Sequence, residues 1–333
     1  MKGEVEIVNY SPEFEERHYE FATKMFGNRR KRRNPDYIYW KFRGEQGHVL
    51  NSFKIALING EVVGQLGVIP CKINLQDEVV DSQWACDLVV DPDYRGKGVA
   101  KLLYEAVHRQ KPITLGSDPS PSAEISMLRA GYKKLKSSNK QFIPIYLGLP
   151  FRMKGINLKF LDTVRNPFLK MFTSTKHKRK FEEINIIETN HHEVFQLEKE
   201  HQIFIDRNID FKNWRCRSFK DYYPGLRLYR LEKTSTYYSG YYHGNIYFIT
   251  DFYLEQSTHF NFIINNILGY IPRNIERIRF LNNSSNELLG SALNTIKYRT
   301  ETSIIYFTND VELDQKINDR YFYYTHQDSD ENI

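Results

Sequence analysis

The chain has 333 residues, of which 26% are charged and 41% hydrophobic, and its formal net charge is +6 at pH 7. This length and composition predict a soluble globular protein of two domains. They exclude a membrane-spanning protein, because no apolar run approaches the roughly 20 residues of a membrane helix. The first residues show no signal-peptide pattern. The three cysteines lack metal-site spacing, which predicts free thiols in a cytoplasmic protein and no metal site.

Strand-like and helix-like segments alternate through the first 150 residues. Ser11 and Pro12 provide an N-cap and a proline at the first helical position, which predict a helix to about residue 26. Asn59 and Gly60 are a strong hairpin signal between two apolar runs. The predicted order is strand 4–8, helix 12–26, strands 53–58, 62–69 and 84–90, helix 101–110, strand 112–116, helix 121–130 and strand 142–147.

The most informative segment is the loop between the strand at 84–90 and the helix at 101–110. Gly96 and Gly98 let backbone N–H groups turn inward, and the following helix N-terminus adds partial positive charge. Arg95 and Lys97 add formal positive charge at the same place. The loop therefore predicts a cradle for a diphosphate. It is not a Walker loop, because Val99 follows Gly98 where that loop needs lysine, and it lacks the spacing of a Rossmann fingerprint.

The pattern Arg95-x-x-Gly98-x-Ala100, with Pro92 and Tyr94 before it, resembles the acyl-CoA pyrophosphate loop of the GNAT superfamily of N-acetyltransferases. The order of predicted elements is also similar to that superfamily over the first 150 residues. The resemblance implies an α/β (α+β) fold with a mixed, largely antiparallel sheet, flanking helices and two splayed parallel strands. It implies coenzyme A as the carrier of the acyl group. By resemblance, the backbone of Leu88, Val89 and Val90 holds the pantetheine, and the pyrophosphate is held by Arg95, Gly96, Lys97, Gly98, Val99 and Ala100.

The resemblance also shows where one catalytic group is missing. Many members of the superfamily carry a tyrosine four residues before a Gly-Phe pair, where it protonates the departing thiolate. Gly131-Tyr132 takes the place of that pair here, and Met127 stands four residues earlier. Methionine cannot donate a proton. The sequence therefore predicts no tyrosine acid at this position.

The second half of the chain repeats the first in a degenerate form. Arg33-Asn34-x-Asp36-Tyr37-x-x-Trp40-Lys41 recurs as Arg207-Asn208-x-Asp210-Phe211-x-x-Trp214-Arg215, which indicates an internal duplication. In the copy we expect strands at 183–187, 226–231, 237–241, 246–254, 277–281 and 303–307, and helices at 191–200, up to 268 and at 284–297.

The duplication divides the sequence into four parts. These are an N-terminal acyl-CoA-binding domain at 1–150, a linker at 151–180, a degenerate GNAT-like domain at 181–325 and an acidic tail at 326–333. Residues 255–258 of the copy contain neither glycine nor a basic residue, so the sequence predicts a single coenzyme A site. The apolar and basic linker fits either a membrane surface or a packed segment, and we favour the packed segment. The basic clusters at 29–33 and 176–180 fit either a phosphate-binding role or a solvated loop.

Several polar and aromatic residues are candidates for catalysis or acceptor binding. Asp87, beside the cleft, is a candidate base, although Asp251 at the matching place in the copy argues for a shared structural task. Asp118 is the second catalytic candidate and Ser117 an acceptor-binding one, the alternative being an N-cap of the next helix. His191-His192-Glu193 is interpreted as helix surface. The other acceptor-binding candidates are Asn34, Trp40, Arg207, Trp214 and Asp251, with core packing as the alternative for the tryptophans.

The duplicated architecture resembles bacterial sugar N-acyltransferases of surface-polysaccharide pathways. This implies transfer of an acetyl or hydroxybutanoyl-type group to the amine of a nucleotide-linked amino-deoxy sugar, with dTDP as the expected nucleotide, by direct attack in a ternary complex. Neither a nucleic-acid partner nor stable membrane insertion is expected, and the sequence does not indicate an oligomeric state. One alternative is an aminoacyl-tRNA-dependent transferase, which the basic cluster at 29–33 would suit but the coenzyme A loop does not. The other is a non-catalytic acyl-CoA-binding protein, which Met127 would suit.

Overall fold

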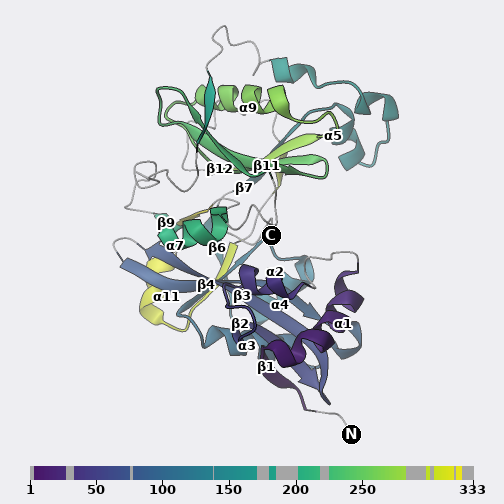
Figure 1. Ribbon diagram of the computed structural model, residues 1–333, viewed down its shortest axis with the longest axis vertical. Coiled ribbons are helices and arrows are strands. Elements are labelled where there is room, and N and C mark those ends of the chain that lie inside the picture. The colour runs from purple at the N-terminus through teal and green to yellow at the C-terminus, as the bar shows by residue number, and fades with distance from the viewer. Residues whose placement is uncertain are drawn as a thin grey trace.

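The computed structural model describes residues 4–27, 34–75, 78–137, 139–170, 180–184, 202–217, 225–282, 298–300, 304–318 and 320–324. These residues form two mixed sheets with helices packed on them, and Figure 1 shows the sheets one above the other. The predicted α/β class is confirmed. The basic cluster at 29–33, most of the cluster at 176–180, residues 191–193, the predicted helix at 284–297 and the acidic tail lie outside the described residues.

The first sheet has nine strands, in the spatial order β1-β2-β3-β4-β5-β15-β6-β16-β9. Strand β9 also pairs with β3, so the strands from β3 to β9 close into a ring. The β4–β5, β6–β16 and β16–β9 pairs are parallel. The strands are β1 Glu6–Tyr10, β2 Leu50–Ile58, β3 Glu61–Leu75, β4 Glu78–Val90, β5 Ile113–Ser117, β6 Lys133–Ser137, β9 Gln202–Ile205, β15 Ile304–Phe307 and β16 Tyr321–Tyr323.

The second sheet has seven strands, in the order β14-β7-β13-β12-β11-β10-β8. Its strands are β7 Asn139–Pro144, β8 Phe181–Ile184, β10 Arg227–Leu231, β11 Tyr237–His243, β12 Ile246–Tyr253, β13 Arg277–Asn282 and β14 Tyr298–Thr300. Helix α9 (His259–Tyr270) covers the face turned away from the first sheet (Figure 1). Its apolar side packs on alternate residues of β7, β12 and β13 to form one hydrophobic core.

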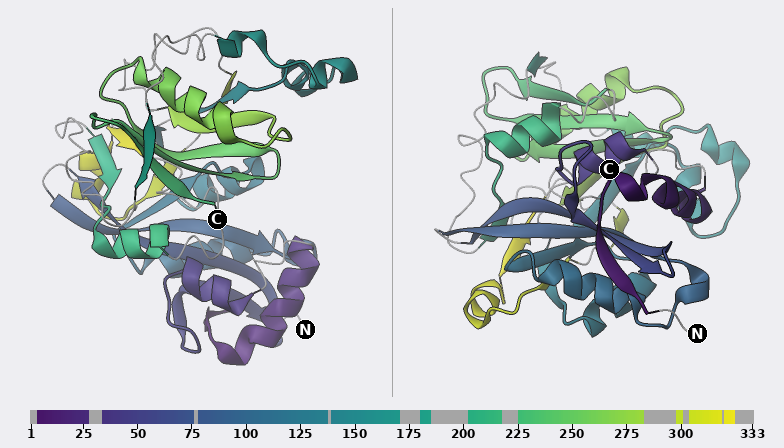
Figure 2. Two further views of the ribbon diagram at one scale, coloured as in Figure 1. Left: turned by 45° about the horizontal axis from the view of Figure 1, so that its top comes forward. Right: turned by 60° about the horizontal axis from the view of Figure 1, so that its bottom comes forward.

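The remaining helices lie around the first sheet and in the connection between the halves, as the further views in Figure 2 show. They are η1 Pro12–Phe14, α1 Glu15–Phe26, α2 Pro35–Lys41, η3 Pro92–Tyr94, α3 Val99–His108, α4 Pro121–Arg129, α5 Gly148–Met153, η4 Lys159–Asp162, η5 Pro167–Leu169, α7 Ile209–Lys212, the π-helix η7 Asn213–Arg217 and α11 Val311–Ile317. In the linker, Leu169 packs into the second core, whereas Phe151, Met153 and Phe160 are exposed.

The two halves exchange strands: β7 of the first half lies in the second sheet, and β9, β15 and β16 of the second half lie in the first sheet. Strand β7 follows β6 in the chain but pairs with β13 and β14 of the second sheet. Strand β15 follows β14 but lies between β5 and β6 of the first sheet. Apart from β7, β9, β15 and β16, the order β1-β2-β3-β4-β5-β6 matches β8-β10-β11-β12-β13-β14, as a duplication requires. The predicted strands at 142–147 and 303–307 thus form in part, but each lies in the opposite sheet from the one expected.

Aromatic side chains fill the space inside the ring of strands. Trp84 is fully buried, and its ring centroid lies 5.8 Å from that of Phe322 and 6.1 Å from that of Tyr324. Ile304 of β15 belongs to the same cluster. The core of the first sheet therefore contains residues from both ends of the chain. The sequence boundary at residue 150 divides the duplicated copies, whereas the hydrogen bonds of both sheets cross it.

The strand exchange predicts that residues 1–150 do not fold alone. Such a fragment lacks β15 between β5 and β6, and it also lacks β16 and β9. We expect it to show no cooperative thermal transition by circular dichroism, because its central sheet has an open gap and Trp84 loses its cover. The matched control is a fragment of residues 1–324, which keeps every described strand and should melt as the full chain does. Cooperative melting of the 1–150 fragment near the full-length Tm would contradict this account.

Candidate functional site

A cleft opens where the parallel strands β4 and β5 part. Their pairing runs from Ser82–Ile113 to Trp84–Leu115 and ends there, although β4 continues to Val90. The cleft has a volume of about 750 Å³. Backbone and side chains of both strands line it, together with residues of α1, α3 and α4. The splayed geometry implied by the sequence resemblance is therefore present, and it leaves one edge of β4 turned toward a cavity.

A β-bulge bends β4 beside this cleft. The β3–β4 register shifts between Gln65 and Gly67, and Asp87 has a positive φ of 55°. The Gln65 amide donates to the Asp87 carbonyl at 3.2 Å, and its Oε1 accepts from Nε2 of His18 at 2.9 Å. His18 and Gln65 are buried. This buried pair holds the bulge from behind and directs the backbone of Leu88 and Val89 to the cleft wall.

Asp87 forms a buried ion pair with the duplicated sequence motif. Its Oδ2 lies 2.6 Å from Nζ of Lys41, with the two side chains 7% and 1% exposed. In the copy, Asp251 Oδ2 lies 2.8 Å from Nη1 of Arg207 and accepts from the Tyr237 hydroxyl at 3.1 Å. Asp87 also lines the cleft. Both aspartates thus attach a strand to the motif that precedes it, which favours the structural task over catalysis.

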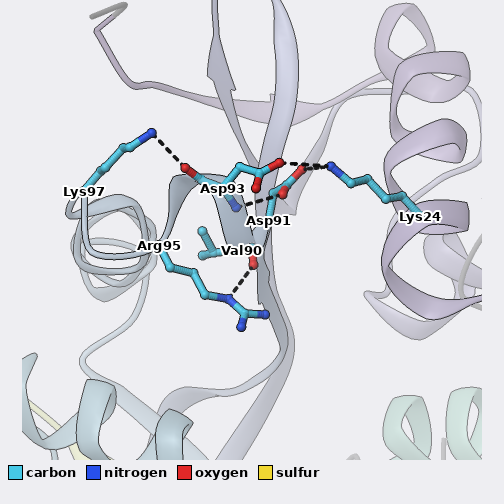
Figure 3. Close-up of polar contacts among 6 residues, drawn as sticks. All are labelled: Lys24, Val90, Asp91, Asp93, Arg95 and Lys97. Atoms are coloured by element: carbon cyan, nitrogen blue, oxygen red, sulfur yellow. Dashed lines mark hydrogen bonds and ion pairs between the residues drawn. The ribbon is translucent and has the colours of Figure 1, made fainter.

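Charged residues of the loop after β4, together with Lys24 of α1, form a set of polar contacts, as Figure 3 shows. Lys24 of α1 binds Asp91 at 2.6 Å, and the Asp91 side chain accepts from the backbone N–H of Asp93 at 3.2 Å. Arg95 Nε donates to the Val90 carbonyl at 3.1 Å, and Lys97 Nζ donates to the Asp93 carbonyl at 2.8 Å. The side chains of Arg95 and Lys97 therefore stabilise the shape of the loop.

The backbone of this loop has the conformation that its glycines predict. Gly96 and Gly98 have φ values of 76° and 84°, and Gly98 is the N-cap of α3. No atom outside the loop lies within 4 Å of where a Cβ would stand at either glycine. The glycines are thus required by backbone conformation rather than by close packing. The first N–H groups of α3 point out of the helix end and can bind an anion.

A groove of about 680 Å³ connects this helix end to the cleft. The two cavities share Leu88, Val89, Ser120 and Ala123, so they form one continuous channel along the edge of β4. Residues of α4 that the sequence analysis did not select, Ser122, Ser126 and Arg129, line its far wall. Their spacing places them on one face of a helix, which is the signal that could have identified them.

The residues after β5 lie at the other end of the channel. Ser117 and Asp118 line the cleft, as the sequence analysis expected. The N-cap of α4 is Ser120, whose Oγ accepts from the N–H of Ala123 at 3.3 Å, so the alternative capping role for Asp118 does not apply. Asp118 instead binds Nζ of Lys140 on the exchanged strand β7. The carboxylate is 39% exposed, far more than that of Asp87.

Met127 closes the floor of the cleft. Its side chain is buried, and a Cβ added to Gly116 would lie 2.4 Å from its Cε. No hydroxyl is supplied at this position, in agreement with the sequence. Tyr104 of α3 lines the same cleft, and burial raises the pKa of its hydroxyl above the ordinary value. The sequence did not single out Tyr104, because the residues around it have the pattern of an ordinary amphipathic helix.

The remaining acceptor candidates have structural partners. Asn34 caps α2 by accepting from the N–H of Asp36 at 2.9 Å. The Trp214 indole N–H donates to the Trp40 carbonyl at 2.8 Å, and the two ring centroids are 6.0 Å apart. Neither these residues nor Arg207 nor Asp251 lines the cleft or the groove. The duplicated motif therefore joins the two halves to each other, and a role in acceptor binding has no support from their positions.

The corresponding site in the copy is filled by side chains. Phe252, Phe260 and Phe280 pack against one another where β12 and β13 part, with centroid separations of 5.3 to 6.3 Å. Helix α9 begins after Thr258 without a glycine in a left-handed conformation. In the described part of the copy, aromatic side chains therefore occupy the place that the cleft takes in the first sheet.

Comparison with known proteins supports this description of the fold. Residues 6–111 match the family model for the acetyltransferase (GNAT) domain. A GCN5-related N-acetyltransferase from Anabaena variabilis superposes with a TM-score of 0.61 at 14% identity, covering 92% of this chain and 74% of that one. A probable N-acyltransferase from Enterococcus faecalis gives 0.59 at 11% identity, covering 96% and 75%.

Yeast N-myristoyltransferase with bound myristoyl-CoA is also similar, with a TM-score of 0.53 at 10% identity, covering 91% of this chain and 82% of that one. No curated protein matches the sequence significantly. The predicted fold class of two GNAT-like units is confirmed, and together these matches support an acyl-CoA-dependent acyltransferase. No helix in the described part of the chain is long and apolar enough to cross a membrane.

The buried Lys41–Asp87 pair gives a test of its structural role. We expect Lys41→Met to lower the free energy of unfolding by about 3–5 kcal/mol, because it leaves a buried carboxylate without its partner. The double variant Lys41→Met/Asp87→Asn should lose less than the sum of the single losses in urea unfolding. Lys111→Met, which breaks the more exposed Lys111–Asp81 pair, is the control and should cost under about 1 kcal/mol. Additive losses would show that the pair is not coupled.

His18 predicts a pH dependence of stability. Burial lowers its pKa from 6.5 to about 4, so the folded protein keeps it neutral while the unfolded chain protonates it below pH 6.5. The contribution of neutral His18 to the free energy of unfolding is fully present above pH 6.5 and is lost as the pH falls toward 4. We expect this loss to be about 2 kcal/mol between pH 7.5 and pH 5. Urea unfolding of His18→Gln should lack that part of the pH dependence. His48→Gln, which changes an exposed imidazole, should retain it, and equal slopes in all three proteins would exclude His18 as the source.

Proposed function

We propose that this protein transfers an acyl group from acyl-CoA to the amine of an acceptor that lies between the two sheets. The continuous channel from the N-terminus of α3 along the edge of β4 to Asp118 is the observation that carries the proposal. One end of the channel suits a diphosphate, and the other end suits a reacting amine. The family match covers β4, the glycine loop and α3, so the similarity and the geometry concern the same residues.

The residues of the channel fit coenzyme A. The N–H groups at the start of α3 would hold the pyrophosphate, with Arg129 and Lys101 beside them. The exposed edge of β4 from Leu88 to Val90 would hold the pantetheine arm and polarise the thioester carbonyl. When bound, acyl-CoA supplies an activated thioester. The bulge at Asp87 sets the direction of that edge, so the protein contributes mainly orientation and oxyanion stabilisation.

Asp118 is the carboxylate best placed to orient the acceptor amine. Asp118 lines the cleft at the acyl end of the channel, and its carboxylate is partly exposed. Its backbone has a positive φ of 44° directly after β5. Asp87 is committed to Lys41 in a buried pair. Direct attack of the amine on the thioester in a ternary complex needs no covalent enzyme intermediate. A catalytic acid is not assigned, and Met127 cannot serve as one.

For the acceptor we propose a nucleotide-linked amino-deoxy sugar, with dTDP as the expected nucleotide and an acetyl or hydroxybutanoyl-type group as the acyl chain. This part rests on the resemblance of the duplicated sequence to sugar N-acyltransferases of surface-polysaccharide biosynthesis. The space between the sheets supports it, because Asp118 at the acceptor end of the channel also lines a cavity with residues of the second sheet.

Coenzyme A binding, measured by calorimetry, tests the site. An alanine at position 96 or 98 costs about 1–2 kcal/mol in the left-handed conformation, so the free loop should favour another backbone conformation. Gly96→Ala and Gly98→Ala should therefore bind coenzyme A roughly five- to thirtyfold more weakly. Gly60→Ala is the matched control, because Gly60 has φ of 80° in the β2–β3 turn, away from the channel. It should be destabilised to a similar extent and bind coenzyme A normally.

Release of free thiol from acetyl-CoA and from hydroxybutanoyl-CoA, each with a panel of amino-sugar nucleotides, tests the activity. We expect release only with an acceptor that carries a free amine. Tight coenzyme A binding without thiol release for any acceptor would favour a non-catalytic acyl-CoA-binding protein. Absence of coenzyme A binding in the wild-type protein would overturn the proposed function as a whole.

A further inference from the structure

A small basic cavity lies on the face of the second sheet that is turned toward the first. It has a volume of about 300 Å³, and Asp118, Lys140, Phe142, Met153, Arg277 and Arg279 are among its lining residues. Phe142 and Arg279 are partners in the β7–β13 register, so they share one face of the sheet. Ile143 and Ile278, at the alternate positions, belong to the core under α9. The cavity therefore faces the space between the sheets.

This cavity adjoins the acyl end of the channel. Asp118 lines both, and Lys140 of β7 binds the Asp118 carboxylate from the cavity side. The loop that suits the pyrophosphate of coenzyme A lies at the opposite end of the channel, beside α3. A group bound between Arg277 and Arg279 is therefore separate from the coenzyme A phosphates and belongs on the acceptor side of the reacting centre.

The charge of the cavity is strongly one-sided. Among the described residues, three cationic side chains and one carboxylate, that of Asp118, line it. Burial lowers the pKa of the Arg279 guanidinium, Asp118 counteracts that effect, and Arg277 adds to it by repulsion. The two guanidinium groups lie 5.7 Å from the ring centroids of Phe142 and Phe248. These cation–π contacts stabilise the guanidinium groups of Arg277 and Arg279 beside each other in the partly buried cavity.

Within the described part of the chain, one donor of Arg277 is unused. Its Nε is buried and has no hydrogen-bond partner among the described residues. A buried donor without a partner is uncommon and costly in a folded protein, and a bound ligand is one explanation. A guanidinium with a vacant N–H beside a second arginine matches the oxygen atoms of a phosphate or carboxylate, which arginine binds in a fork geometry.

We propose that Lys140, Arg277 and Arg279 bind an anionic group of the acceptor, a phosphate or a carboxylate, and so place its amine beside Asp118. The inference rests on the proposed function and names the chemical class of its acceptor. A volume of about 300 Å³ is at the lower end for ligand sites, so the cavity accommodates the charged group with a small part of the molecule. The rest of the acceptor extends past Met153, which is half exposed.

Calorimetric titration with inorganic pyrophosphate and with succinate, both in saturating coenzyme A, tests the proposal. Saturating coenzyme A occupies the α3 loop, so the added anion reports on the second site. We expect Arg277→Gln and Arg279→Gln to weaken anion binding at least tenfold and Arg279→Lys to weaken it less, since lysine keeps the charge. Arg227→Gln, an exposed arginine that pairs with Glu183 in the same sheet, is the control and should leave binding unchanged.

The outcomes separate this inference from the proposed function. Stronger binding of pyrophosphate assigns a phosphate, stronger binding of succinate assigns a carboxylate, and either supports the anionic pocket. Failure of both anions to bind the wild-type protein, or equal binding by wild type, Arg277→Gln and Arg279→Gln, would overturn it while coenzyme A binding stays intact. If coenzyme A itself does not bind, the titration without it tells whether the arginine pocket exists independently. Melting curves of each variant confirm that the fold is retained.

Discussion

The hydrogen bonds of β7 and β15 join the two halves of the molecule, because each strand pairs in the sheet built mainly from the other half. A strand inserted between two others satisfies backbone groups on both of its edges, so its removal would leave both neighbours unpaired. The rest of the structure depends on this exchange. It fixes the distance between the sheets, places β16 and β9 so that the first sheet closes into a ring, and covers Trp84.

The exchange also assembles the site. Channel and cavity meet at Asp118, which directly follows β5 of the first sheet, and its partner Lys140 comes from the strand that has crossed to the second. Arg277 and Arg279 stand on β13, directly beside that crossed strand. The donor end of the channel needs only local structure, namely the bulge at Asp87 and the glycines before α3. The acceptor end exists only where the two halves are joined, which gives the duplicated and degenerate second half a clear task.

The donor end could be predicted from the sequence because its information is local. Two glycines, an Asp-Pro turn and a following helix determine the loop, and the structure has the left-handed glycines that this pattern requires. The duplicated motif could also be recognised in the sequence, but its structural role could not be predicted. Asn34 and Trp40 recur in the copy because they cap a helix and pack across the interface between the halves, and conserved spacing within one chain does not distinguish such tasks from binding. The arginine cavity could not be predicted, because Lys140 and Arg279 become neighbours only through a strand pairing that no local pattern specifies.

The position of β15 has a consequence for synthesis on the ribosome. Strand β5 ends at Ser117, but the residue that pairs with it is Ile304, about 190 residues later, which at roughly 5–20 residues per second is on the order of 10 to 40 s. During that interval the nascent N-terminal half has two unpaired strand edges at the middle of its sheet, and such edges readily pair with other chains. Protection of the nascent chain is therefore a requirement that this topology imposes on the cell. A chain interrupted before residue 304 would contain the whole coenzyme A loop and yet lack β15 and β16, which complete the first sheet.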